Sequence, residues 1–139
     1  MIVLDTNVLS ALMRKAPEPK VVRWLDAQPA DAIWITSITL FEARLGLGLL
    51  PDGRRRRALE SAFERLLAED LEGRVLDFDR ATAESAAQLA AERQLRGRPV
   101  DLRDTQIAGI VLSRRARLAT RNTRHFADLG RDVIDPWAD

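Results

Sequence analysis

The sequence contains no cysteine and only one histidine, His125. The absence of cysteine excludes disulfide bonds, zinc sites built on thiolates and a thiol nucleophile. A single histidine excludes a metal site built on several imidazoles. No apolar run approaches the roughly 18 residues that span a membrane. The N-terminus also lacks the basic and long apolar segments of a secretory signal. We therefore expect a soluble cytoplasmic protein without a membrane partner.

Lysine is scarce as well, since Lys15 and Lys20 are the only two among 22 basic residues. The net charge of +1 hides an uneven distribution. Residues 93–124 contain nine arginines and two aspartates, a balance of +7, whereas residues 58–92 contain three arginines and nine acids, a balance of −6. Basic segments can guide phosphate groups to a site. On charge alone, solvated arginine-rich helix faces explain the pattern slightly better.

Short apolar segments alternate with longer helical patterns along the chain. Apolar residues make up 46% of the 139 residues, which is enough for one core and predicts a single domain over residues 1–139. We predict strands at 2–4, 33–35, 75–76, 118–119 and 133–134, and helices at 7–13, 21–25, 36–50, 59–67, 80–96 and 104–112. This alternation predicts an α/β fold with a mostly parallel four- to five-stranded sheet and helices on both faces. The segment 38–67 is expected to form a helical hairpin that projects from the sheet.

Three carboxylates follow predicted strands or begin the helices after them. Asp5 follows the first strand, Glu42 lies early in the helix after the second, and Asp104 lies in the first turn of a later helix. Such positions meet at one edge of a parallel sheet, where ligands bind in open α/β folds. Clustered carboxylates repel each other, and Mg²⁺ relieves this repulsion while keeping water and phosphate ligands. The pattern therefore favours metal-assisted hydrolysis of a phosphodiester.

Each of these side chains also has a purely structural interpretation. Asp5 could be a turn residue or an N-cap, and Glu42 fits a Thr-x-x-Glu capping box with Thr39. Asp104 could only complement a helix dipole. Asn122, after the fourth strand, belongs to the same sheet edge, but a cap for a short helix is the better explanation.

The neighbouring polar and aromatic residues are expected to be structural. We expect His125 at the surface or in a helix cap, with only a weak case for contact with RNA. Asp101 is expected to cap the helix that carries Asp104. Trp24, Trp34 and Trp137 lie in apolar contexts and are expected in the core rather than as platforms for bases.

The ordered set of motifs resembles the PIN-domain ribonucleases of the VapC toxin type, close to the FitB-like branch. Each motif is weak by itself, but together the motifs extend over nearly the whole chain. They are Ile-Val-Leu-Asp-Thr-Asn at 2–7, Thr-Leu-Phe-Glu at 39–42 with Leu-Gly at 45–46, Asp-Thr-Gln-Ile-Ala-Gly at 104–109, Ala-Thr-Arg-Asn at 119–122 and Asp-Pro-Trp at 135–137.

This resemblance implies an endoribonuclease that depends on Mg²⁺, with Mn²⁺ as a substitute, and that cuts single-stranded or loop RNA. Asp5 and Asp104 match the family's metal-binding aspartates, and Glu42 matches its third acid, which often acts through a metal-bound water. Thr6 matches the hydroxyl that holds Asp5 in place. Arg121 is expected to contact the RNA backbone.

The resemblance also implies partners. The chain would be the toxin of a type II toxin–antitoxin pair, forming a homodimer or a higher toxin–antitoxin assembly. A VapB-type antitoxin would insert its C-terminal segment into the cleft. Contact with DNA would occur only through that antitoxin.

Two positions depart from the family pattern. Asn122 stands where many PIN domains have an aspartate, so the site has one less negative charge and we expect one tight metal site. Gly109 stands in the place of the second residue of an Ala-Ala pair, a change expected to affect packing more than chemistry.

Three other interpretations compete with this one. A receiver-type phosphoacceptor domain would need a further acid pair and a late lysine, which this chain lacks after Lys20. A haloacid-type phosphatase would need Asp-x-Asp where the chain has Asp5-Thr6-Asn7. A PIN-fold RNA-binding or scaffold module without activity is the closest alternative, and metal-dependent cleavage of RNA would distinguish it.

Overall fold

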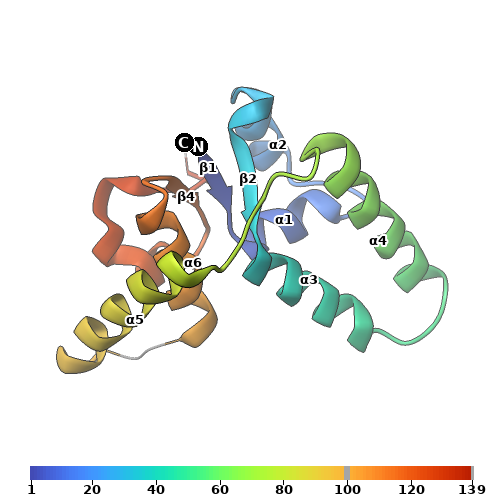
Figure 1. Cartoon of the computed structure of the whole chain (residues 1–139). Coiled ribbons are helices and arrows are strands. Elements are labelled where there is room, and N and C mark those ends of the chain that lie inside the picture. The colour runs from blue at the N-terminus through green and yellow to red at the C-terminus, as the bar shows by residue number, and fades with distance from the viewer. Residues whose placement is uncertain (99–100, 139) are drawn as a thin grey trace.

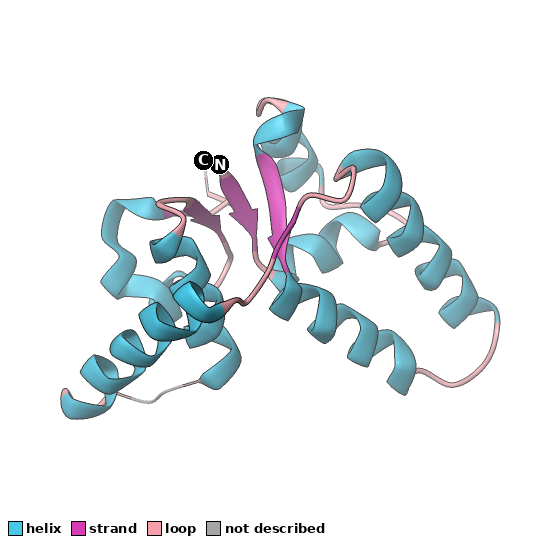
Figure 2. Ribbon diagram, in the orientation of Figure 1, coloured by secondary structure: helices cyan, strands magenta, loops and turns pink. Residues whose placement is uncertain are grey.

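The computed structural model describes residues 1–98 and 101–138 and contains one central sheet. Its strands are β1 (Ile2–Leu4), β2 (Ile33–Thr36), β3 (Val75–Leu76), β4 (Arg117–Ala119) and β5 (Val133–Ile134). They lie in the order β3-β2-β1-β4-β5, and all four neighbouring pairs are parallel. Figure 1 and Figure 2 show this sheet between two groups of helices. The predicted α/β fold with a parallel sheet is confirmed.

The longer helices connect these strands as the sequence predicts. They are α1 (Thr6–Met13), α2 (Pro19–Asp26), α3 (Ser37–Leu49), α4 (Arg54–Arg65), α5 (Arg80–Leu95) and α6 (Leu102–Ser113). Shorter helical segments are η1 (Ala30–Ala32), the π-helical η2 (Leu66–Asp70) and η3 (Thr123–Asp132). The chain leaves β1 for β2 on one side and later reaches β4 on the other. This reversal makes the carboxyl ends of β1 and β4 a topological switch point, where α/β folds bind ligands.

The side chains of β1 alternate between the two faces of the sheet, as the two-residue period of a strand requires. Ile2 and Leu4 belong to the core formed with α1, α2, α3 and α4. Val3, which is fully buried, belongs to the second core formed with α5, α6 and η3. Helices therefore cover both faces, which holds β1 rigidly and fixes the place where Asp5 follows it.

Helix α5 lies unusually close to α6. A Cβ atom added to Gly109 of α6 would lie 2.6 Å from Cβ and 2.7 Å from Cα of Ala86 in α5. Real Cβ atoms do not approach each other so closely, so the glycine is required by the contact. The departure from the Ala-Ala pattern therefore concerns packing, as expected, but this packing has no room for a methyl group.

Helices α3 and α4 form the expected hairpin and extend from the sheet opposite α5 (Figure 1). The outer face of α3 exposes Phe41, Leu45 and Leu49, which are spaced four residues apart and share one side of the helix. The three tryptophans are half-buried and pack against the two cores. Within the described residues, no helix has the length and apolar content needed to span a bilayer.

Candidate active site

Asp5 is buried at the carboxyl end of β1, with 4% of its surface exposed. Its Oδ1 accepts a hydrogen bond from the Thr6 N–H at 2.8 Å and caps α1. Its Oδ2 accepts hydrogen bonds from the Thr120 hydroxyl at 2.7 Å and from Asn7 Nδ2 at 3.2 Å. Helix α1 thus begins at Thr6 with Asp5 as its cap, one residue before the predicted start at residue 7. Capping and a chemical role do not exclude each other, because Oδ1 accepts only one of these hydrogen bonds and keeps a second lone pair.

The environment of Asp5 disfavours its charged form. Burial raises the pKa of this carboxyl above its ordinary value, and the negative charge of Asp104 adds to the rise. The hydrogen bonds from Thr120, Thr6 and Asn7 oppose it. A cation beside Asp5 would relieve this cost.

Thr120 and Asn7 were not predicted as site residues, although Thr120 directly follows β4 and Asn7 lies in the first turn of α1. The Thr120 side chain is fully buried beyond β4, and its hydroxyl also accepts hydrogen bonds from Asn7 Nδ2 and the Asn122 N–H. Asn7 Oδ1 accepts from the Arg121 N–H at 3.1 Å. These contacts join the ends of β1 and β4. The sequence signal that could have identified Thr120 was its position as a hydroxyl residue at the end of a predicted strand.

Glu42 lies in α3 and is held by Thr6. Its Oε1 accepts the Thr6 hydroxyl hydrogen bond at 2.8 Å, and its Oε2 lies 3.7 Å from Arg103 Nη1. The prediction that the Thr6 hydroxyl holds Asp5 was therefore wrong. That contact comes from the Thr6 N–H, while the hydroxyl reaches the acid of another helix.

The capping-box interpretation of Glu42 is also wrong. The N-cap of α3 is Thr36, whose hydroxyl accepts a hydrogen bond from the Thr39 N–H at 3.0 Å. Glu42 lies in the second turn, too far along the helix to reach the first backbone N–H groups. Its side chain is consequently available to the sheet edge.

Asp104 lies in the first turn of α6, opposite Asp5. As predicted, Asp101 caps this helix, and its Oδ1 accepts from the Asp104 N–H at 2.9 Å. Burial raises the pKa of Asp104, the charges of Asp101 and Glu42 add to the rise, and His125 opposes it. Asp104 therefore shares an electrostatic environment with both other acids, beyond any effect on its own helix.

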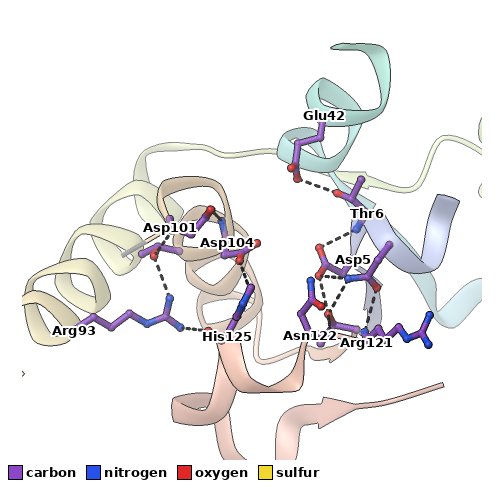
Figure 3. A network of polar contacts seen from close by, with 12 residues as sticks. Asp5, Thr6, Glu42, Arg93, Asp101, Asp104, Arg121, Asn122 and His125 are labelled. Atoms are coloured by element: carbon purple, nitrogen blue, oxygen red, sulfur yellow. Dashed lines mark hydrogen bonds and ion pairs between the residues drawn. The ribbon is translucent and has the colours of Figure 1, made fainter. Parts of the chain in front are cut away.

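His125 makes a contact with Asp104 that the sequence did not predict. Its ring is exposed, as expected, but its Nδ1 lies 2.9 Å from Asp104 Oδ2. Figure 3 shows Asp104 and His125 on one side of the site, with Asp5, Thr6 and Glu42 on the other. A lone histidine in an irregular segment gives no sequence signal for such a contact.

The buried Arg93 of α5 holds this side of the site in place. Its guanidinium donates two hydrogen bonds of 2.7 Å to the carboxylate of Asp128, one of 3.0 Å to the Thr105 hydroxyl and one of 3.1 Å to the His125 carbonyl. Thr105 is next to Asp104, so Arg93 connects α5, α6 and η3. In the sequence this arginine stands out only as part of the basic segment 93–124.

Two further predicted residues lie at the edge of the site. Asn122 precedes η3, but its side chain makes no capping hydrogen bond. The Arg121 guanidinium stacks over the Trp137 ring at 5.0 Å and points away from the acids in Figure 3. The contact of Arg121 with the RNA backbone stays a prediction.

The acids fit a divalent cation by chemistry rather than as a closed cage. Within the described residues, no group of three His, Asp or Glu side chains is close enough to hold one ion. Mg²⁺ commonly takes only one or two protein carboxylates and completes its octahedron with water and phosphate oxygens. Asp5 and Asp104 would supply such a pair, and burial raises the pKa of each.

A family model described as "PIN domain" matches residues 2–132. The chain belongs to the PIN-domain family. This PIN domain is 38% identical to VapC ribonuclease Y4jK of Sinorhizobium fredii over 137 residues, which cover 99% of this chain and 98% of that protein. It is 34% identical to Toxin FitB of Neisseria gonorrhoeae, with all of both chains covered. These relatives confirm the resemblance to the VapC type and its FitB-like branch.

Solved structures agree with this assignment. The PIN domain matches a chain of the FitAcB crystal structure from Neisseria gonorrhoeae with a TM-score of 0.90 and 33% identity, over all of both chains. It matches a chain of DNA-bound VapBC from Salmonella typhimurium with a TM-score of 0.79 and 30% identity, over 97% of each. The fold is therefore that of the FitB and VapC structures.

Proposed function

We propose that this PIN domain is a metal-dependent endoribonuclease and the toxin of a toxin–antitoxin pair. The observation that supports this most strongly is that Asp5, Glu42 and Asp104 act on one another across the sheet edge, since the charge of Asp104 raises the pKa of Asp5 and that of Glu42 raises the pKa of Asp104. Asp5 and Asp104 would hold Mg²⁺, for which Mn²⁺ can substitute. Glu42 would orient the attacking water. The relatives named VapC ribonuclease and tRNA(fMet)-specific endonuclease VapC support RNA as the substrate.

Mg²⁺, when bound, would lower the pKa of a water molecule and polarise a phosphoryl oxygen. The protein's own contribution is to position the groups. Three hydrogen bonds fix the Asp5 carboxylate, and Thr6 fixes Glu42 from the adjacent residue. Such fixed groups need little reorganisation during the reaction. Single-stranded or loop RNA is the proposed substrate, because its bases and backbone are accessible.

We also propose a VapB-type antitoxin as the partner, with DNA bound only through it, and a homodimer of the toxin. The solved complexes of FitA with FitB bound to an IR36 DNA fragment, and of VapBC bound to DNA, support this proposal. Their toxin chains have the same fold over nearly the whole length.

The decisive experiment incubates purified, antitoxin-free protein with structured total RNA in Mg²⁺ or EDTA. Native protein should give discrete fragments in Mg²⁺ only, and Asp5→Asn should give none while remaining folded. Asp79→Asn is the matched control, because Asp79 caps α5 and lies outside the proposed site. Asparagine caps a helix about as well as aspartate, so this variant should stay folded and still cut.

Two other results would change the assignment. Folded native protein that binds RNA without cutting it would support the non-catalytic RNA-binding alternative. Protein that neither cuts RNA nor binds Mg²⁺ in calorimetry would show that the acids serve only as caps and structural contacts.

A further inference from the structure

We propose that a pocket beside Asp104 holds one nucleotide of single-stranded RNA, with its phosphate on Arg98 and Arg124. The pocket is a cavity of about 400 Å³ between the end of α5, the start of α6 and η3. Its walls include both arginines together with Asp101, Asp104 and His125. The inference rests on the proposed nuclease function, because it extends the same site along the RNA.

The two arginines are the basic groups of this pocket that are free to bind a ligand. Arg93 also lines it, but each of its guanidinium nitrogens already donates to Asp128, Thr105 or His125. Within the described residues, the guanidinium groups of Arg98 and Arg124 form no hydrogen bond or ion pair, although the charge of Arg98 helps to lower the pKa of Asp128. Both residues line the pocket and are exposed to solvent.

The charge of the pocket depends on the cation proposed at Asp104. Without a cation, Arg98 and Arg124 balance Asp101 and Asp104, so the pocket is close to neutral. A divalent ion on Asp104 would leave an excess of positive charge beside the scissile phosphate. A neighbouring phosphate of the same strand would then be the natural anion, because Arg binds phosphate through paired hydrogen bonds.

The walls also suit an unstacked base. Unpaired bases in protein–RNA complexes stack on histidine rings or arginine planes, and this pocket contains both kinds of surface. Its volume lies within the range of small-ligand pockets. A base held in a duplex could not enter, so the pocket would select single-stranded RNA. The predicted contact at Arg121 would then be secondary, since that guanidinium lies on Trp137.

The test measures binding of a labelled single-stranded RNA in Mg²⁺, in proteins that all carry Glu42→Gln, so that the cation proposed at Asp104 is present while cleavage cannot interfere. The double variant Arg98→Gln/Arg124→Gln is compared with Arg23→Gln/Arg57→Gln, which removes the same charge from exposed arginines of α2 and α4. We expect the pocket variant to bind about 10-fold more weakly at 0.1 M salt. Loss of this one phosphate contact should reduce the slope of log K against log salt by about 0.7. The control should stay near native, and thermal unfolding should be unchanged in both.

A second measurement uses Mg²⁺ and an RNA substrate that the native protein cuts. In the pocket variant, KM should rise by a larger factor than kcat falls. The proposal would be overturned if the pocket variant kept the native Kd, salt slope and KM. It would also be overturned if the control variant lost as much affinity as the pocket variant. The nuclease assignment can fail separately. If the pocket variant binds RNA more weakly but native protein does not cut it, the pocket proposal stands and the nuclease proposal is wrong. If native protein cuts RNA but the pocket variant has unchanged Kd and KM, the nuclease proposal stands and the pocket proposal is wrong.

Discussion

Thr6 shows how one residue can organise two acids. Its N–H belongs to the first turn of α1 and binds Asp5, whereas its hydroxyl leaves the helix and binds Glu42 of α3. The first contact follows from local sequence, because an aspartate before a helix accepts from nearby N–H groups. The second joins residues 36 positions apart and exists only because β1 and β2 are neighbours.

Replacing Thr6 by valine should therefore impair catalysis more than folding. The valine keeps the N–H that caps α1 but cannot donate to Glu42, which remains partly solvated. Loss of such a supporting contact typically costs 10- to 100-fold in activity. Cleavage of a mapped RNA site should fall by about that factor, and Thr6→Ser should restore it. Full activity in Thr6→Val would show that Glu42 does not need this hydrogen bond.

At the scale of elements, the Arg93–Asp128 pair joins α5 to η3 and makes stability depend on pH. Hydrogen bonds from Arg93 lower the pKa of Asp128 below its ordinary value. The folded state therefore favours the carboxylate, and this stabilisation is present above about pH 4 and is lost as the pH falls through the lowered pKa.

Asp128→Asn should leave the buried Arg93 charge without a full partner. We expect a loss of about 3 kcal/mol in the free energy of unfolding at pH 7, measured by urea titration. The difference from native protein should shrink as the pH falls below about 4, because native Asp128 then becomes neutral as well. A difference that stays constant down to pH 2 would contradict the role of this ion pair.

The contact between α5 and α6 gives a second test at this scale. Gly109→Ala should destabilise the fold by about 1 to 3 kcal/mol, because the new methyl group would overlap the backbone of Ala86. Gly48→Ala in α3 is the matched control, since nothing lies within 4 Å of its added Cβ. That variant should gain about 0.5 to 1 kcal/mol from helix propensity. Thermal unfolding of the two proteins should therefore shift in opposite directions.

At the scale of the whole molecule, α3 exposes the apolar face of Phe41, Leu45 and Leu49, with only Arg103 lying over the Phe41 ring among the described cation–ring contacts. Leu49 is 76% exposed, and Phe41 and Leu45 of the same helix are exposed as well. Contiguous apolar surface of this kind usually marks an interface. It is the surface that we expect the proposed homodimer to use.

Leu49→Glu should weaken self-association without unfolding the protein. Light scattering coupled to size-exclusion chromatography should show a shift from dimer toward monomer. Leu95→Glu is the control for charging an exposed leucine as such, since Leu95 is 89% exposed at the end of α5. A dimer that survives Leu49→Glu would exclude this face as the interface.

Local sequence alone determined much of this protein. The alternation of short apolar segments with helical patterns predicted the parallel sheet. Buried strands and half-buried helices each require apolar residues at a characteristic spacing, and the chain displays these spacings in turn. Asp5 after β1 and Asp104 after its cap Asp101 could be predicted from the same local rules. The ordered motifs predicted the family.

Tertiary structure alone decided which groups meet. The hydroxyl of Thr120 reaches Asp5 over 115 positions, and Arg93 reaches Asp128 over 35, because distant strands and helices are packed together. His125 became a partner of Asp104 only because Arg93 holds η3 against α6. Such contacts depend on the order of strands and the packing of helices, and no local pattern of residues encodes them.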